Sequence, residues 1–104
     1  MKTLKFLIEK MDDTLEEIEE YAEKAHVVRH DHKVLADCYI KVAEMHVSIY
    51  GMLHDRVVEL IKEEHERGNV PHPAMAAIWE FEHEKLIKKL SDAKSLIDDF
   101  KRTY

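Results

Sequence analysis

The sequence is poor in the residues that interrupt helices. Only two glycines and two prolines occur among its 104 residues, and three of these four fall in the stretch 68–73. Because glycine and proline are the strongest local breakers of regular structure, so few of them predict long, uninterrupted helices. The same scarcity makes 68–73 the one clear boundary between elements.

Cysteine and long apolar runs are also scarce. The single cysteine, Cys38, cannot form an internal disulfide, and we expect it to be a small apolar residue of the core. No segment approaches the roughly 18 apolar residues of a membrane span. The apolar run Phe6-Leu7-Ile8 meets Glu9 too early for a signal peptide. We therefore expect a soluble, cytoplasmic protein with no membrane partner.

Basic residues do not gather into one surface. The net charge is −6, and the lysines and arginines are scattered among acidic residues. Without a basic face, the attraction that dominates nucleic-acid affinity is missing, so we expect no nucleic-acid partner. The acid-rich run 12–23 has two interpretations. We favour the solvated face of a helix over a mimic of the DNA backbone that occupies a DNA-binding protein.

Hydrophobic periodicity predicts three helices, over residues 3–29, 32–67 and 73–102. The first has apolar residues in steps of four and three, the pattern of a coiled-coil-like seam: Leu4, Ile8, Met11, Leu15, Ile18, Ala22 and Ala25. The third repeats this pattern: Ala76, Trp79, His83, Leu86, Leu90, Ala93, Ile97, Phe100 and Tyr104. The second has a wider stripe, which predicts two neighbours: Leu35, Cys38, Tyr39, Val42, Met45, Ile49, Met52, Leu53, Val57 and Leu60.

Local signals mark most of the helix ends. Gly68 suits the C-terminal end of the second helix, and Pro73 suits the first turn of the third. Asp31 is a good N-cap and favours a break near His30, although a continuous helix through this point is the alternative. The fold class is therefore all-α, with a single domain over residues 1–104 that forms an antiparallel three-helix bundle.

The predicted helices differ in length. At 1.5 Å per residue they span about 39, 54 and 45 Å, so the first cannot cover the other two. Folding back the chain places Leu4 near the level of His54 and leaves a two-helix tip beyond it. The third helix begins apolar on almost every side, which predicts burial on every side. We therefore expect a homodimer that covers this tip. The alternative is that the first helix shifts along the bundle, or that the N-terminus folds over, to cover it. The expected interface residues are Val58, Ile61, Met75, Ile78, Trp79 and Phe81.

The eight histidines raise the possibility of a metal site. Two Glu-x-x-His segments, Glu23–His26 and Glu80–His83, match half of a helical di-iron ligand set, but the bundle separates them by roughly 30 Å. What remains is one candidate transition-metal site formed by His54, Glu80 and His83. The alternative, which we favour, is a buried polar network in which a carboxylate satisfies an imidazole.

Residues from Leu35 onward resemble a group of short helical proteins encoded in prophages of Gram-positive bacteria. The matching positions are Leu35-Ala36-Asp37, Glu44, His46, Leu53-His54, Val57, Gly68, Pro71, Met75 and His83-Glu84-Lys85. The resemblance covers about two-thirds of the chain. It implies a phage or prophage setting and carries over no catalytic residue. The outline is also similar to ferritin-like bundles.

Motifs of known chemistry are missing. The sequence contains no glycine-rich phosphate loop, no Gly-x-Ser-x-Gly elbow and no Cys-x-x-Cys pair, so we assign no catalytic residue and no cofactor beyond the candidate metal. We expect a protein without enzymatic activity that associates with itself and with a phage or host protein. The alternative is a ferritin-like bundle that binds a transition metal.

Overall fold

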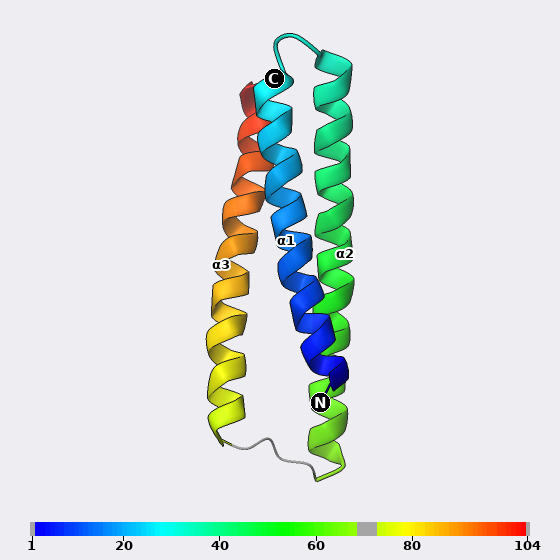
Figure 1. Ribbon diagram of the computed structural model, residues 1–104, viewed down its shortest axis with the longest axis vertical. Coiled ribbons are helices and arrows are strands. Elements are labelled where there is room, and N and C mark those ends of the chain that lie inside the picture. The colour runs from blue at the N-terminus through cyan, green and yellow to red at the C-terminus, as the bar shows by residue number, and fades with distance from the viewer. Residues whose placement is uncertain (1, 69–72, 104) are drawn as a thin grey trace.

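Three long helices make up the described part of the chain. The computed structural model describes the backbone of residues 2–68 and 73–103, and their side chains except at positions 2, 73–79, 81 and 103. The helices are α1 (Lys2–Val28), α2 (Lys33–Glu66) and α3 (Pro73–Thr103), and no strand occurs in these ranges. They alternate in direction along one axis (Figure 1), which gives an elongated molecule of 56 × 19 × 18 Å. The all-α fold with three helices was predicted correctly.

The helix ends agree closely with the predicted ones. Gly68 follows α2 with a φ of 81°, a left-handed conformation that glycine adopts without strain, and its N–H donates to the His65 carbonyl at 3.0 Å. The break between α1 and α2 is also present. The N-cap residue of α2 is His32, which makes no side-chain capping bond. The prediction that Asp31 is the N-cap of this helix was therefore wrong.

The cores of α1 and α3 follow the predicted periodicity. Five of the predicted α1 positions are buried, and Leu4 and Ile8 pack against them in part: Met11, Leu15, Ile18, Ala22 and Ala25. In α3 four predicted positions are buried: Leu86, Ala93, Ile97 and Phe100. The predicted positions Ala76, Trp79 and Tyr104 lie outside the described side chains.

The core face of α2 differs from the predicted one. Its buried residues are Ala36, Ile40, Ala43, Tyr50 and Val57. Of the ten stripe residues predicted for this helix, only Val57 is buried; Tyr39, Val42, Leu53 and Leu60 are half-buried, and the rest are exposed. The predicted stripe therefore lies mostly on the outer side of α2. The prediction chose the wrong face because two apolar stripes with helical spacing run along this helix, and the inner one contains the small residues Ala36 and Ala43.

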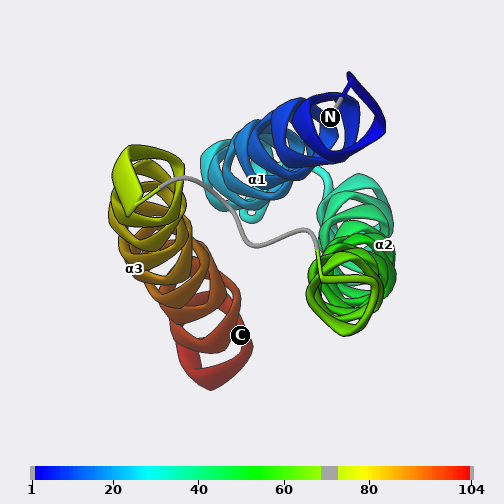
Figure 2. The same cartoon turned by 90° about the horizontal axis from the view of Figure 1, so that it is seen from below.

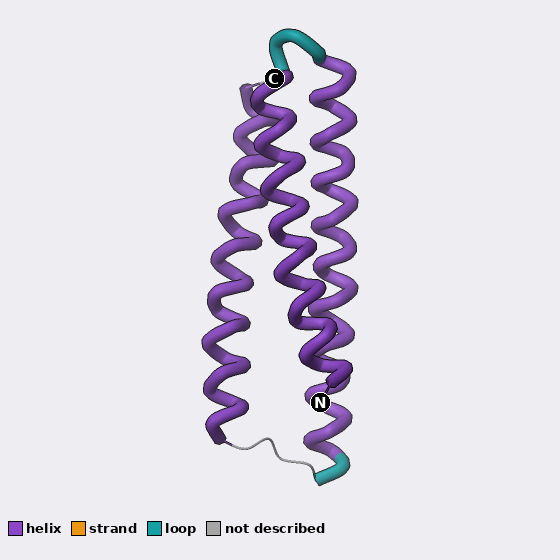
Figure 3. The backbone as a smooth tube through the Cα atoms, viewed as in Figure 1, coloured by secondary structure: helices purple, strands orange, loops and turns teal. Residues whose placement is uncertain are grey.

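Helix α1 holds the bundle together. It packs along α2 and more sparsely against α3, whereas α2 and α3 approach each other at few points. Figure 2, a view along the bundle, shows α1 beside both partners, with α2 and α3 on either side of it. In Figure 3 the N-terminal end of α1 lies beside the last part of α2, and only a short stretch of α2 continues past it. Val57 is fully buried, so the uncovered tip is shorter than predicted.

No helix within the described ranges is both long and apolar enough to cross a membrane.

Candidate functional site

Two histidines meet where α2 and α3 face each other. His54 lies on α2 and His83 on α3, and their Nε2 atoms are 3.2 Å apart. The two imidazole rings are nearly parallel, with an interplanar angle of 21° and centroids 5.4 Å apart. The structure thus brings together two of the three residues that the sequence singled out for a metal.

A contact with Asp55 favours one tautomer of His54. Its Nδ1 lies 3.5 Å from Oδ1 of Asp55, a long contact to a carboxylate that can only accept a hydrogen bond. A neutral His54 that donates from Nδ1 leaves its Nε2 as an acceptor. The proton shared between the two rings then belongs to Nε2 of His83, which donates to Nε2 of His54.

The third residue of the predicted site is not part of this pair. Glu80 is exposed, and the side chains that the structure describes contain no group of three or more potential ligands placed to hold one ion. The arrangement is a histidine pair with a carboxylate behind one member. Its role with a metal stays a prediction.

A buried tyrosine lies beside the pair. The ring of Tyr50 stacks with that of His54 at an interplanar angle of 24° and a centroid distance of 6.4 Å. Tyr50 is 3% exposed, and its hydroxyl finds no hydrogen-bond partner among the described groups. Burial raises the pKa of the Tyr50 phenol above its ordinary value of 10.0, because the low-dielectric surroundings disfavour the phenolate.

Tyr50 and His54 also line an open groove of about 200 Å³ between α2 and α3. The other lining residues are Val47, Gly51, Ile87, Leu90 and Lys94. The groove lies between two helices that contact each other at few points. The histidine pair is therefore reachable from solvent.

The predicted interface residues divide into two groups. Val58 is exposed and Ile61 is half-buried, packed against the core. The other four, Met75, Ile78, Trp79 and Phe81, lie outside the described side chains. An interface at the tip of the bundle therefore stays a prediction.

A continuous apolar stripe runs along the outer side of α2. Its members, separated by alternating steps of three and four, are Leu35, Cys38, Val42, Met45, Ile49 and Met52, and we name them the outer stripe. Met45 and Met52 are 64% and 72% exposed, and Val42 is the one half-buried member. Six of the nine large hydrophobic side chains that are exposed among the described residues belong to α2, so the apolar surface is concentrated on this helix.

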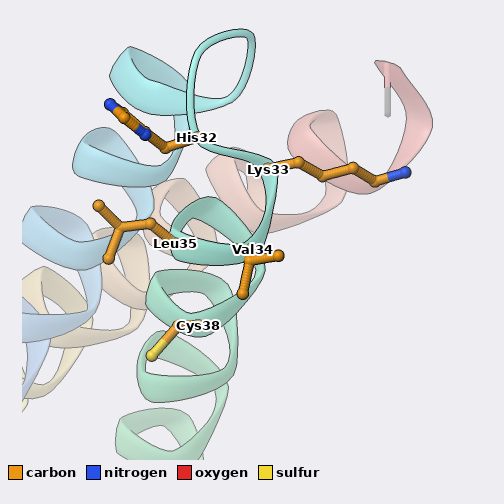
Figure 4. A pocket seen from close by; sticks show the side chains of 5 residues that line it. All are labelled: His32, Lys33, Val34, Leu35 and Cys38. Atoms are coloured by element: carbon orange, nitrogen blue, oxygen red, sulfur yellow. The ribbon is translucent and has the colours of Figure 1, made fainter.

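The outer stripe begins at an open hollow in the first turns of α2. Val34, Leu35 and Cys38 line it together with His32 and Lys33 (Figure 4). Cys38 is exposed. The prediction that Cys38 belongs to the core was therefore wrong. It was wrong because the prediction chose the outer stripe, which contains Cys38, as the buried face of this helix.

The sequence did not predict the structural role of His26. Its Nε2 lies 3.0 Å from the Leu96 carbonyl of α3, and Arg29 lies 3.3 Å from its Nδ1. Because arginine only donates, Nδ1 is the acceptor and Nε2–H donates to the carbonyl. His26 thereby ties α1 to α3, a contact that no local pattern signals. His46 is half-buried, and its Nδ1 lies 2.9 Å from the Val42 carbonyl oxygen.

The fold places this chain in the class of small all-helical bundle proteins. No protein-family model, curated protein or solved structure matches it.

Proposed function

We propose that this chain acts by self-association, as a homodimer formed through the outer stripe of α2, and that it is an interaction protein without enzymatic activity. Its setting is a phage or prophage, and a phage or host protein is its further partner. The observation that carries the proposal is the exposure of a stripe with coiled-coil spacing on a helix whose opposite side already packs in the core.

The spacing of the outer stripe favours a second copy as its occupant. In a two-stranded coiled coil, apolar residues at steps of three and four fit between the same residues of a facing helix. One stripe can therefore bury itself against an identical stripe through a twofold axis, with no other sequence required. Contiguous apolar patches of this kind are rare on monomeric proteins.

The size of the stripe sets the expected strength of the dimer. Residues 35–52 extend over about 26 Å of helix. This is a narrow strip compared with the roughly 800 Å² per partner that a standard interface buries. We therefore expect dissociation in the micromolar range if the outer stripe acts alone.

The predicted tip interface lies on a different side of α2. Val58 is nine residues after Ile49, which places the two side chains about half a turn apart around the helix. A single helix-to-helix contact cannot bury both. Variants of the two surfaces therefore separate the two dimers.

The decisive variant is Met45→Glu/Met52→Glu. Both side chains are exposed and glutamate is a strong helix former, so the monomer fold should be retained. Loss of the buried methionines and the charge at the interface should weaken the dimer by about a hundredfold or more. Sedimentation velocity at about 100 μM, well above the expected dissociation constant, should show mainly dimer for the unaltered chain and mainly monomer for the variant.

The control is Val58→Glu, which places one exposed glutamate on the tip and should leave the dimer intact. An unaltered chain that sediments as a monomer would overturn self-association itself. Dissociation of Val58→Glu with an intact Met45→Glu/Met52→Glu dimer would reject the outer stripe and support the tip.

A further inference from the structure

The Nε2 atoms of the histidine pair between α2 and α3 lie at the spacing of two ligands of one metal ion. We propose that His54 and His83 bind one divalent transition-metal ion through their Nε2 atoms, and that this ion clamps α2 to α3. The proposal does not rest on the outer stripe, because the pair lies on the side of α2 that faces α3.

The distance between the two nitrogens fits the ion. Zinc binds imidazole nitrogens at about 2.0–2.1 Å with tetrahedral geometry, which places two such nitrogens about 3.3 Å apart. The observed separation of the Nε2 atoms is 3.2 Å. The donor atoms are therefore already at the spacing that one bound ion requires. The rings must rotate on binding so that both lone pairs point at the ion.

The surroundings of His54 resemble those of a metal ligand. Metal-bound histidines usually donate their other ring N–H to a carboxylate, which fixes the tautomer and the ring. Asp55 occupies this position behind His54, and the Tyr50 ring stacks with the imidazole. In this tautomer the Nε2 lone pair of His54 is ready to bind.

His83 needs one change to become the second ligand. In the hydrogen-bonded pair its Nε2 carries the proton, so a metal can bind there only when that proton moves to Nδ1 of the same ring. This tautomer shift conserves the total number of protons. The ion then replaces the hydrogen bond between the rings, and both histidines stay neutral.

Water completes the coordination sphere in this proposal. The adjacent groove between α2 and α3 is open, so solvent reaches the pair. Glu80 lies three residues before His83 on the same helix and is exposed, and the proposal does not require it as a ligand. Imidazole ligands suit zinc, nickel and copper and disfavour magnesium and calcium.

The clamp should be visible as metal-dependent stability. Because α2 and α3 contact each other sparsely, an ion held by both adds a connection that the unfolded chain lacks. We expect Zn²⁺ in excess to raise the melting temperature of the tag-free, full-length chain by about 5 °C or more, and Mg²⁺ to have no effect. EDTA should reverse the rise.

Three variants test the assignment by circular dichroism and isothermal titration calorimetry. His54→Gln and His83→Gln should each abolish the zinc-dependent rise and weaken zinc binding at least tenfold. His65→Gln, which removes an exposed histidine near the end of α2, is the control and should keep both. Each variant is compared with its own metal-free melting temperature, so a change in basal stability does not obscure the result.

A second measurement locates the ion directly. Paramagnetic Ni²⁺ should broaden the NMR signals of the His54 and His83 rings before those of the other six histidines. No stabilisation by zinc, or a stabilisation that persists in both His54→Gln and His83→Gln, would overturn the proposal. So would broadening that begins at other histidines.

Discussion

Tyr50 carries a buried hydroxyl group without a hydrogen-bond partner among the described groups, whereas buried polar groups are usually hydrogen-bonded. A hydroxyl removed from water without a hydrogen-bond partner costs free energy, about 1–3 kcal/mol by mutational comparisons. Among the described groups this oxygen has no such partner, and the residue is almost completely buried. The aromatic ring, in contrast, fills the core and stacks with His54. Ring and hydroxyl therefore make opposite contributions to stability.

Replacement of Tyr50 by phenylalanine separates these contributions. Tyr50→Phe keeps the ring and removes the hydroxyl, so the free energy of unfolding should rise by about 1 kcal/mol at neutral pH. Chemical denaturation of both proteins measures the difference. A matched control is Tyr39→Phe on the same helix, where the residue is half-buried, and the change there should be smaller. A clear loss of stability in Tyr50→Phe would show that the hydroxyl is hydrogen-bonded.

The pH dependence of stability gives an independent prediction for the same residue. Burial raises the pKa of Tyr50 above 10.0 in the folded state. The unfolded chain therefore loses this proton first as the pH rises, and the stability that the neutral phenol contributes is present below about pH 10 and lost above it. Denaturation between pH 9 and pH 11 should show a smaller decline in Tyr50→Phe than in the unaltered chain. Equal declines would contradict the assignment.

At the scale of the element, α3 depends on a few buried side chains. It shares little contact with α2, so its attachment to α1 carries its stability. Leu86 is 2% exposed in the core, and its neighbour Ile87 is 49% exposed. An ion pair between Lys89 and Asp12, at 2.7 Å, and the contact of His26 with Leu96 complete the connection to α1. The ion pair is largely solvated and should add little.

Leu86→Ala and Ile87→Ala form a matched pair. Leu86→Ala removes buried atoms and leaves a cavity, which should lower the free energy of unfolding by about 2–5 kcal/mol. Ile87→Ala removes a side chain that is half in water, and its cost should be below about 1 kcal/mol. Urea denaturation compares the two. Equal losses would mean that Ile87 is covered in solution, for example by a second copy.

The helices differ in how well the sequence predicts them. In α1, and in the part of α3 whose side chains the structure describes, the predicted apolar stripe faces the core. In α2 two stripes share the same spacing, and the outer one carries the larger apolar side chains. The inner one contains Ala36 and Ala43, small residues fully buried in the core, so hydrophobicity alone selects the wrong face. Only the position of α1 decides between them.

The candidate site shows the same limit. The meeting of His54 with His83 follows from helix lengths and turn positions, which the sequence contains. The contact of His26 with the Leu96 carbonyl depends on the rotation of α1 against α3, which no pattern within one helix specifies.

At the scale of the whole molecule, the elongated shape leaves the outer side of α2 open along its length. Two copies could join their outer stripes in parallel or antiparallel, and charge favours antiparallel. Between residues 55 and 66, α2 carries five acidic residues and two basic ones. Parallel helices would place these two acidic segments side by side, whereas antiparallel helices separate them and also oppose their dipoles.

The antiparallel arrangement also has a register that uses every member of the stripe. Coiled-coil packing then pairs Leu35 with Met52 of the second copy, Cys38 with Ile49, and Val42 with Met45. In the last two pairs a smaller side chain packs against a larger one, so the combined side-chain volumes of these two pairs are similar. A parallel, in-register dimer would instead place Cys38 opposite Cys38 of the second copy.

Cysteine cross-linking distinguishes the two arrangements. Disulfides need Cα atoms within about 4.4–6.8 Å. In the antiparallel register, Ile49→Cys should form a covalent dimer through Cys38 of the other copy under mild oxidation with diamide, and the unaltered chain should not. Ile87→Cys adds an exposed thiol on α3 and serves as the control, which should stay uncrosslinked on non-reducing gels. Efficient cross-linking of the unaltered chain without any gain from Ile49→Cys would establish the parallel dimer instead, because only that arrangement brings the two native cysteines together.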